Sequence, residues 1–393
     1  MSGFYLTALL TSFAPINRGS AGFLPSPRPP HDLDQIKVPK MNMSSRIAYT
    51  LATLFVSAPA LAAPPTVFIP EGSANSVLMV QAETGKVLRR INDVEAVHGL
   101  AGAPGVPYLV AGSYSEIPRE DVASLEKPST VSADDHAAHH APKAAPMGPP
   151  DAGISLLSIL DAKSGDILRR IEVPGAVHHT AVSPDGRFAV ATHPAGDGIS
   201  VIDLATFGMT AFVPTGSMPN YAAFGTDPNL VYVSNTGNGT ISEVDLSRGI
   251  VRRNFIAGDT PEHMAVSPET DRLFVADADA GQVLELSLST GEKLRTFEIG
   301  GEIHGLGLSN DGATLFVAGR GEDKLASVAL ATGEVRTATL APEPYHLTVI
   351  PGSDILYVSS RAEPVVWLID TSSLQTRETV SVEGEGHQMV ALP

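Results

Sequence analysis

One residue position recurs through this 393-residue chain at intervals of 41 or 42 residues. A constant interval of this length marks a repeated structural unit, so the residues at this position are expected to occupy equivalent places in space. The first interval is 81 residues, which is one repeat plus an insertion. Six of the seven residues are histidines: His98, His179, Tyr221, His263, His304, His346 and His387.

Each repeat contains four short segments rich in β-branched and aromatic residues, separated by turn signals. One copy runs through residues 263–267, 272–276, 282–288 and 293–299. The pairs Asp185-Gly186 and Asp311-Gly312 supply the positive φ that tight hairpins need. Four strands in about 40–45 residues predict the blade of a β-propeller.

The two ends of the repeat array complement each other. The array begins with only three predicted strands, at residues 66–69, 76–81 and 86–91, and it ends with a single strand at 388–392. One C-terminal and three N-terminal strands make a complete blade, and this closure removes exposed sheet edges. The sequence therefore predicts an all-β, seven-bladed propeller with four antiparallel strands per blade.

The amino-acid sequence of the repeats resembles that of the YVTN-type seven-bladed propellers. The closest copy is residues 231–245, VYVSNTGNGTISEVD, with weaker copies at 274–277 and 356–359. The resemblance covers nearly everything from Thr66 to Pro393. It implies the fold, whereas function has to come from the site, because this scaffold hosts enzymes and binding modules alike.

The first 62 residues do not look like part of the propeller. Residues 1–40 include a proline-rich stretch, and we interpret them as a mis-assigned or extended leader. Residues 41–62 combine Arg46, an apolar run and small residues before Ala63, which is typical of a secretory signal peptide. The propeller is then expected over 63–393, in the periplasm, with a His-rich insertion at 114–152.

Charge and cysteine content exclude several functions. Removal of residues 1–62 takes away five basic and two acidic residues, which leaves 21 basic and 41 acidic residues. Such an acidic chain is not expected to bind nucleic acid or anionic membranes, and the apolar run is too short for membrane insertion. The absence of cysteine excludes disulfides, thiolate metal sites and cysteine nucleophiles.

Strand order predicts that the histidines gather on one face. The innermost strand of each blade begins at the repeat position, and the loops between the second and third strands open on the same face. The insertion is such a loop, and His193 belongs to another. His178, next to His179, joins the repeat histidines as a candidate metal ligand at the mouth. The loops add candidates for secondary metal capture: His136, His139, His140, His193, Asp134 and Asp135. Carboxylates flank the mouth at Glu262, Glu302, Glu343 and Glu385.

Neutral imidazole is the commonest protein ligand for metals, so this face predicts a metal centre. A zinc ion takes three or four protein ligands, which means that a subset binds or that there are two sites. Without cysteine, Zn(II) and copper remain candidates. Register leaves a conflict, because His178 and His304 share one register while His179, His263 and His346 share another, and a one-residue slip reverses a side chain. A scaffold with an incidental histidine ring also remains open.

A secreted propeller with a histidine-filled mouth and a His-rich loop resembles the periplasmic zinc metallochaperones of zinc ABC importers. The resemblance implies zinc held by the mouth histidines, dynamic capture by the loop, and delivery to the importer's solute-binding protein. On this interpretation we expect a monomer without catalytic activity. For imidazoles with a free pKa near 6.5, zinc affinity should weaken below about pH 6.

Two rival functions place chemistry at the same face. One is a copper-binding redox or storage propeller. The other is a propeller lactonase or hydrolase, which would use the mouth residues together with Arg320 and Arg361, because both arginines occupy loops of the predicted face. No nucleophile elbow, P-loop or dinucleotide fingerprint occurs in the chain.

Overall fold

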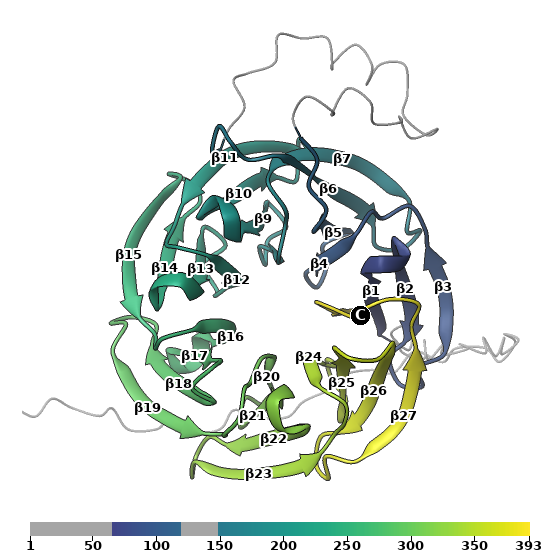
Figure 1. The fold of residues 1–393 in the computed structure, drawn as a ribbon, viewed down its shortest axis with the longest axis vertical. Coiled ribbons are helices and arrows are strands. Elements are labelled where there is room, and N and C mark those ends of the chain that lie inside the picture. Colours follow the sequence, from purple (N-terminus) through teal and green to yellow (C-terminus); the bar gives the residue numbers. More distant parts are fainter. Residues whose placement is uncertain (1–64, 119–147) are drawn as a thin grey trace, which may run out of the picture. The chain divides into compact units, whose positions relative to one another are not determined.

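Seven four-stranded sheets surround a central axis in the computed structural model, which describes residues 65–118 and 148–393 (Figure 1). Neighbouring strands within each sheet are antiparallel, so each sheet is one blade of a β-propeller. The predicted fold is therefore confirmed. In these two ranges no helix has the length and apolar character needed to cross a membrane.

Six blades follow one another along the chain, and each starts with its innermost strand (Figure 1). Their strands are β4 (Val97–Ala101), β5 (Tyr108–Ser113), β6 (Ile154–Asp161) and β7 (Ile167–Pro174); β8 (Thr180–Val182), β9 (Phe188–His193), β10 (Gly198–Asp203) and β11 (Gly208–Pro214); β12 (Pro219–Phe224), β13 (Leu230–Asn235), β14 (Thr240–Asp245) and β15 (Ile250–Ile256); β16 (Pro261–Ser267), β17 (Arg272–Asp277), β18 (Gln282–Ser287) and β19 (Lys293–Glu298); β20 (Leu306–Leu308), β21 (Thr314–Gly319), β22 (Lys324–Ala329) and β23 (Glu334–Thr339); and β24 (Pro344–Val349), β25 (Ile355–Ser360), β26 (Val365–Asp370) and β27 (Thr376–Ser381).

Short 3₁₀ turns connect several of these strands. They are η1 (Gly72–Ala74), η3 (Pro194–Gly196), η4 (Thr236–Asn238), η5 (Pro268–Thr270) and η6 (Arg320–Glu322).

The seventh blade joins the two ends of the array. β28 (Val390–Leu392) pairs with β1 (Thr66–Glu71) so that Leu392 lies opposite Thr66, and β2 (Ser76–Gln81) and β3 (Val87–Ile91) complete the sheet. This confirms closure by one C-terminal and three N-terminal strands. The closing blade therefore has four paired strands, like the other six blades.

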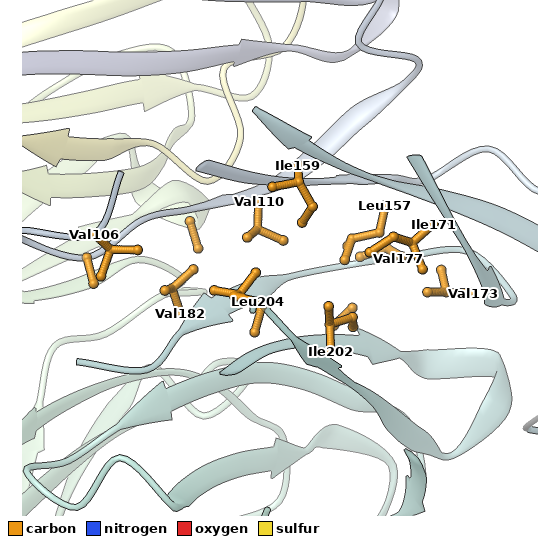
Figure 2. Packing of buried hydrophobic residues seen from close by; sticks show 14 residues of the cluster. Val106, Val110, Leu157, Ile159, Ile171, Val173, Val177, Val182, Ile202 and Leu204 are labelled. Carbon is orange, nitrogen blue, oxygen red and sulfur yellow. The ribbon is translucent and has the colours of Figure 1, made fainter. Parts of the chain in front are cut away.

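Apolar side chains fill the wedges between adjacent blades. The middle strands are buried on both faces and therefore read as continuous apolar runs, as in β13, whereas outermost strands such as β19 are mostly exposed. Burial of each valine, leucine or isoleucine contributes roughly 1.5–3 kcal/mol. Figure 2 shows one wedge, between the blades of β4–β7 and β8–β11, which includes Val110, Leu157, Ile159, Val177 and Ile202.

The segments predicted as a leader and a signal peptide, and most of the insertion, lie outside the described residues. This includes the predicted capture residues His136, His139, His140, Asp134 and Asp135, whose metal-binding role stays a prediction. The insertion leaves β5 at Ser113 and rejoins the blade at β6, so it opens between the second and third strands as predicted.

Candidate metal centre

Seven imidazoles from six blades converge at the mouth of the central channel. All belong to the starts of inner strands or to the residues just before them. Neighbouring ring centroids lie 3.3–4.9 Å apart, as shown by the pairs His98–His387, His387–His346, His346–His304, His304–His263, His263–His179, His179–His178 and His178–His98. The predicted site residues of the inner ring are therefore brought together.

The predicted conflict of register is absorbed by bulges at the entrances of the inner strands. In β16 the pairing moves from Pro261 opposite Asp277 to Met264 opposite Val275, so one extra residue is accommodated at Glu262–His263. The same irregularity occurs at the start of β4, β12 and β24. A β-bulge redirects side chains locally, which turns His263 and His346 toward the axis. His178, His179 and His304 precede β8 and β20, so strand register does not set their direction.

Two glycines next to histidines let the inner strands approach closely. A Cβ atom on Gly99 would stand 2.8 Å from the backbone nitrogen of Thr180, and one on Gly305 would stand 2.6 Å from the carbonyl oxygen of Tyr345. Any side chain there would push neighbouring blades apart. The small residues thus keep the imidazoles within reach of one another.

Backbone carbonyls and one carboxylate fix the tautomers of three histidines. Nδ1 of His98 donates to the carbonyl of His178 at 2.8 Å, and Nδ1 of His179 donates to the carbonyl of Asn220 at 2.8 Å. Nδ1 of His304 is hydrogen-bonded to the Glu262 carboxylate. Because a carbonyl only accepts, Nδ1 of His98 and of His179 carries the proton, and Nε2 keeps its lone pair for a metal.

Three buried ring nitrogens have no hydrogen-bond partner among the described residues: His179 Nε2, His263 Nε2 and His387 Nδ1. A buried polar atom without a partner costs about 1–3 kcal/mol, so such atoms require an explanation. A divalent cation would engage such nitrogens: His179 and His263 belong to one set of close imidazoles, and His387 belongs to two others. The donor set therefore fits a metal of the zinc or copper type.

The imidazoles fall into three sets whose ligand atoms lie within 4.8 Å of one another. His346 and His387 each belong to two of these sets, and their Nε2 atoms stand 2.9 Å apart. The set of His98, His178 and His387 shares no residue with the set of His179, His263 and His346, so the geometry accommodates one ion or two. The sets are His98, His178 and His387; His179, His263 and His346; and His304, His346 and His387.

Burial keeps these imidazoles neutral. Loss of solvation, reinforced by neighbouring histidines, lowers the pKa of His98 to about 3. The same desolvation lowers the pKa of His179, His263, His346 and His387 well below 6.5. Neutral imidazole is the form that binds metal, so proton competition starts at a lower pH than for free imidazole. Zinc affinity is therefore expected to weaken at a lower pH than the threshold near pH 6 expected for free imidazoles.

Three side chains, those of Glu262, Tyr345 and Tyr221, support the ring from outside. Glu262 supports His304, and Tyr345 stacks on His304 with ring centroids 3.9 Å apart. Tyr221, which replaces the seventh histidine, stacks on His263 at 4.3 Å. Burial raises the pKa of the Glu262 carboxyl, against the opposing effect of Arg320.

Substitution of Glu262 by alanine is expected to weaken metal affinity about tenfold to a hundredfold, the usual effect of losing a carboxylate that orients a ligating histidine. The measurement is competition for zinc against a chromophoric chelator. Glu343, an exposed carboxylate of the same predicted face, provides the matched control, and its replacement by alanine should leave the affinity unchanged. Equal affinities of both variants would refute a positioning role for Glu262.

Gln388 ties three inner segments together beside the ring. Its Oε1 accepts from the backbone nitrogens of Leu100 and Thr180 at 3.1 and 3.0 Å, and its Nε2 donates to the Thr180 carbonyl at 2.8 Å. The amide therefore connects the C-terminal segment to β4 and β8. This cross-link rigidifies the channel wall behind the imidazoles.

His193 differs from the other candidates. It is buried, with Nδ1 donating to the carbonyl of Gly175 at 3.1 Å and Nε2 paired with the Ser200 hydroxyl at 2.8 Å. Both ring nitrogens of His193 are hydrogen-bonded, so its role is structural, at the junction of β9 and β10. The proposed centre does not include it.

Arg320 and Arg361 lie at the mouth, beside Tyr345, as the lactonase alternative requires. Their guanidinium carbons stand 5.6 and 5.1 Å from the Tyr345 ring centroid. Arg320 is ion-paired with Glu302. The mouth thus combines imidazoles, a carboxylate, a phenol and two guanidinium groups.

Comparison with known proteins supports the fold. No protein-family model and no curated protein matches the chain. A periplasmic gluconolactonase from Pseudomonas aeruginosa is 17% identical, with a TM-score of 0.62 over 84% of this chain and 99% of that protein. A candidate 6-phosphogluconolactonase from Bacteroides fragilis is 13% identical, with a TM-score of 0.64 over 86% and 100%. A protein of unknown function from Desulfotomaculum acetoxidans is 13% identical, with a TM-score of 0.65 over 83% of this chain and 98% of that protein.

The expectation of a protein without catalytic activity is corrected by these comparisons. Solved structures with this fold include propellers named as lactonases. At identities of 13–17% the likeness shows the fold alone, so no substrate is carried over. Hydrolysis at the mouth becomes a candidate function on the strength of the residues there.

Proposed function

We propose that this protein binds Zn(II) in the ring of mouth histidines and passes it to the solute-binding protein of a zinc ABC importer in the periplasm. The observation that carries the binding step is the set of buried ring nitrogens without partners, in a cluster of neutral imidazoles. Delivery, partner and compartment come from the resemblance in the sequence. Copper is the alternative cargo, because imidazole suits both ions.

A graded arrangement of ligands supports transfer as well as binding. His98 and His178 are half-buried, whereas His179, His263 and His346 are buried. The sets overlap through His346 and His387, so an ion can exchange one imidazole at a time between them. Stepwise exchange avoids a fully dissociated intermediate, which suits a protein that receives and hands on a cation.

The test of binding is the metal content of protein purified without a histidine tag. We expect one to two equivalents of zinc and no visible colour, whereas a blue or violet protein would indicate copper. Protein that retains no metal and binds zinc only at micromolar concentrations or weaker would contradict the proposal.

Directed delivery needs a separate experiment. Zinc-loaded protein is mixed with the apo solute-binding protein in the presence of a chelator whose affinity lies between those of donor and acceptor. We expect the acceptor to fill faster than the chelator removes zinc from the donor alone. If the chelator always intercepts the zinc, the delivery step is wrong even though binding stands.

A second candidate function is metal-assisted hydrolysis of a lactone or ester. The observation that favours it is the group of Arg361, Tyr345 and Glu262 beside three imidazoles, because three histidine ligands leave a coordination position open to substrate. A bound divalent ion would supply Lewis acidity there. Turnover of glucono-δ-lactone by zinc-loaded protein, lost on substitution of Arg361 by glutamine, would support it; hydrolysis no faster than in buffer would exclude this substrate.

A further inference from the structure

Arg361 is a cation at the mouth for which no carboxylate among the described residues forms an ion pair. It follows β25, is exposed, and forms no ion pair with any residue in the described ranges. Its Nη1 donates to the Tyr345 hydroxyl at 3.5 Å. Arg320 differs, because its guanidinium is committed to Glu302. The free donors of Arg361 are therefore available to a ligand that enters the mouth.

Tyr345 connects this arginine to one set of imidazoles. Its ring centroid lies 3.9 Å from that of His304, 4.7 Å from that of His346 and 5.4 Å from that of His387. These three histidines form a candidate metal triad. The hydroxyl points to Arg361, so the phenol and the guanidinium present two donors beside the triad.

The charge balance at the mouth favours an anion once a divalent cation is bound. The charges acting on Tyr345 come from Arg361, Arg320, Glu262 and Glu385, and Glu302 is paired with Arg320. A divalent ion and two arginines bring four positive charges against three carboxylates. One positive charge is then left over beside the buried imidazoles, where a monoanion restores neutrality.

We propose that the mouth takes a small carboxylate anion as an additional ligand, held by Arg361 and the Tyr345 hydroxyl and completing the coordination of a divalent ion at His304, His346 and His387. A planar carboxylate matches the fork of a guanidinium, and three protein ligands leave a position open on the metal. The proposal rests on metal binding by this centre. It holds whether the ion is cargo or cofactor.

The experiment is a titration of cobalt-loaded protein with acetate, D-gluconate, phosphate and chloride, followed by the visible absorption of the cobalt ion. We expect acetate and gluconate to shift the spectrum saturably, more tightly than phosphate or chloride. Arg361→Gln should weaken carboxylate affinity about tenfold to a hundredfold, as expected for losing hydrogen bonds to a charged group, while cobalt is still bound. Tyr345→Phe should weaken it less.

The matched control is Arg336→Gln, which removes an arginine whose guanidinium donates to the Ser372 carbonyl at 3.0 Å on the outermost strand. It should titrate like the wild type. Equal carboxylate affinity in Arg361→Gln and wild type, tighter binding of phosphate or chloride, or no spectral change with cobalt bound would each overturn the anion site. Failure to bind cobalt would instead overturn the proposed metal centre, and the anion site with it.

Discussion

Combined replacement of His346 and His387 by phenylalanine should abolish tight zinc binding. Each of the three candidate sets contains at least one of these two residues, so no complete set survives in the double variant. Structural zinc sites gain roughly 10–16 kcal/mol, or about 3 kcal/mol per ligand when four ligands share it. Two of the sets lose one ligand and the third loses two, which predicts a decrease in affinity of at least about a hundredfold.

Competition with a high-affinity chelator measures this change. Tyr221→Phe is the matched control, because Tyr221 occupies the equivalent repeat position and stacks on His263 without offering an imidazole. It should bind zinc like the wild type. A single substitution of His346 should lie between the two, since the set of His98, His178 and His387 remains complete. Normal affinity in the double variant would show that the centre is misplaced.

The metal-free protein should unfold steeply in mild acid. Burial lowers the pKa of eight histidines in the folded chain: His98, His178, His179, His193, His263, His304, His346 and His387. In the unfolded chain each titrates near 6.5. Below that pH the unfolded state binds more protons than the folded state, so the free energy of unfolding falls as the pH falls.

Each histidine that stays neutral in the fold contributes about 1.4 kcal/mol per pH unit, and the eight together contribute up to roughly 11 kcal/mol per pH unit. This is comparable to the whole stability of a domain, about 5–15 kcal/mol. The same linkage therefore predicts an unfolding midpoint at about pH 5. The stabilisation is complete above pH 6.5 and is lost below it.

Circular dichroism during an acid titration checks this expectation. Zinc should shift the transition to lower pH, because bound imidazoles cannot take up protons until the metal leaves. The variant with both His346 and His387 replaced by phenylalanine should show a shallower dependence in the metal-free state, since two titrating groups are gone. A metal-free protein equally stable at pH 7 and pH 4 would contradict the description of the histidines as buried and neutral.

The sequence predicted the propeller because its signals are local and repeated. Four strands with turn residues recur in each unit, and the ends complement each other, so blade number and closure followed without tertiary information. The gathering of the histidines at the channel mouth was predicted from their shared position in the repeat. The direction of each side chain was not, because the bulge at Glu262–His263 is a tertiary response to neighbouring strands that no local pattern marks.

The supporting residues were only partly visible in the sequence. Glu262 stood out as a flanking carboxylate, but Tyr345 and Gln388 did not. Tyr345 occupies the position before a repeat histidine, as Glu262 does, but in several other repeats this position holds an apolar residue or glycine, so the sequence gives no consistent signal for the supporting residues. His193 was predicted to lie on the metal-binding face. Its hydrogen bonds to Gly175 and Ser200 depend on tertiary contacts that sequence spacing does not encode.

The most direct test of the metal centre is an anomalous difference map of zinc-loaded crystals, collected on both sides of the zinc absorption edge. A histidine centre predicts one or two peaks inside the ring, each about 2.0–2.1 Å from ring nitrogens of at least three histidines of a single set. The absence of any peak among these imidazoles at full zinc occupancy, or zinc bound only at surface carboxylates, would contradict it.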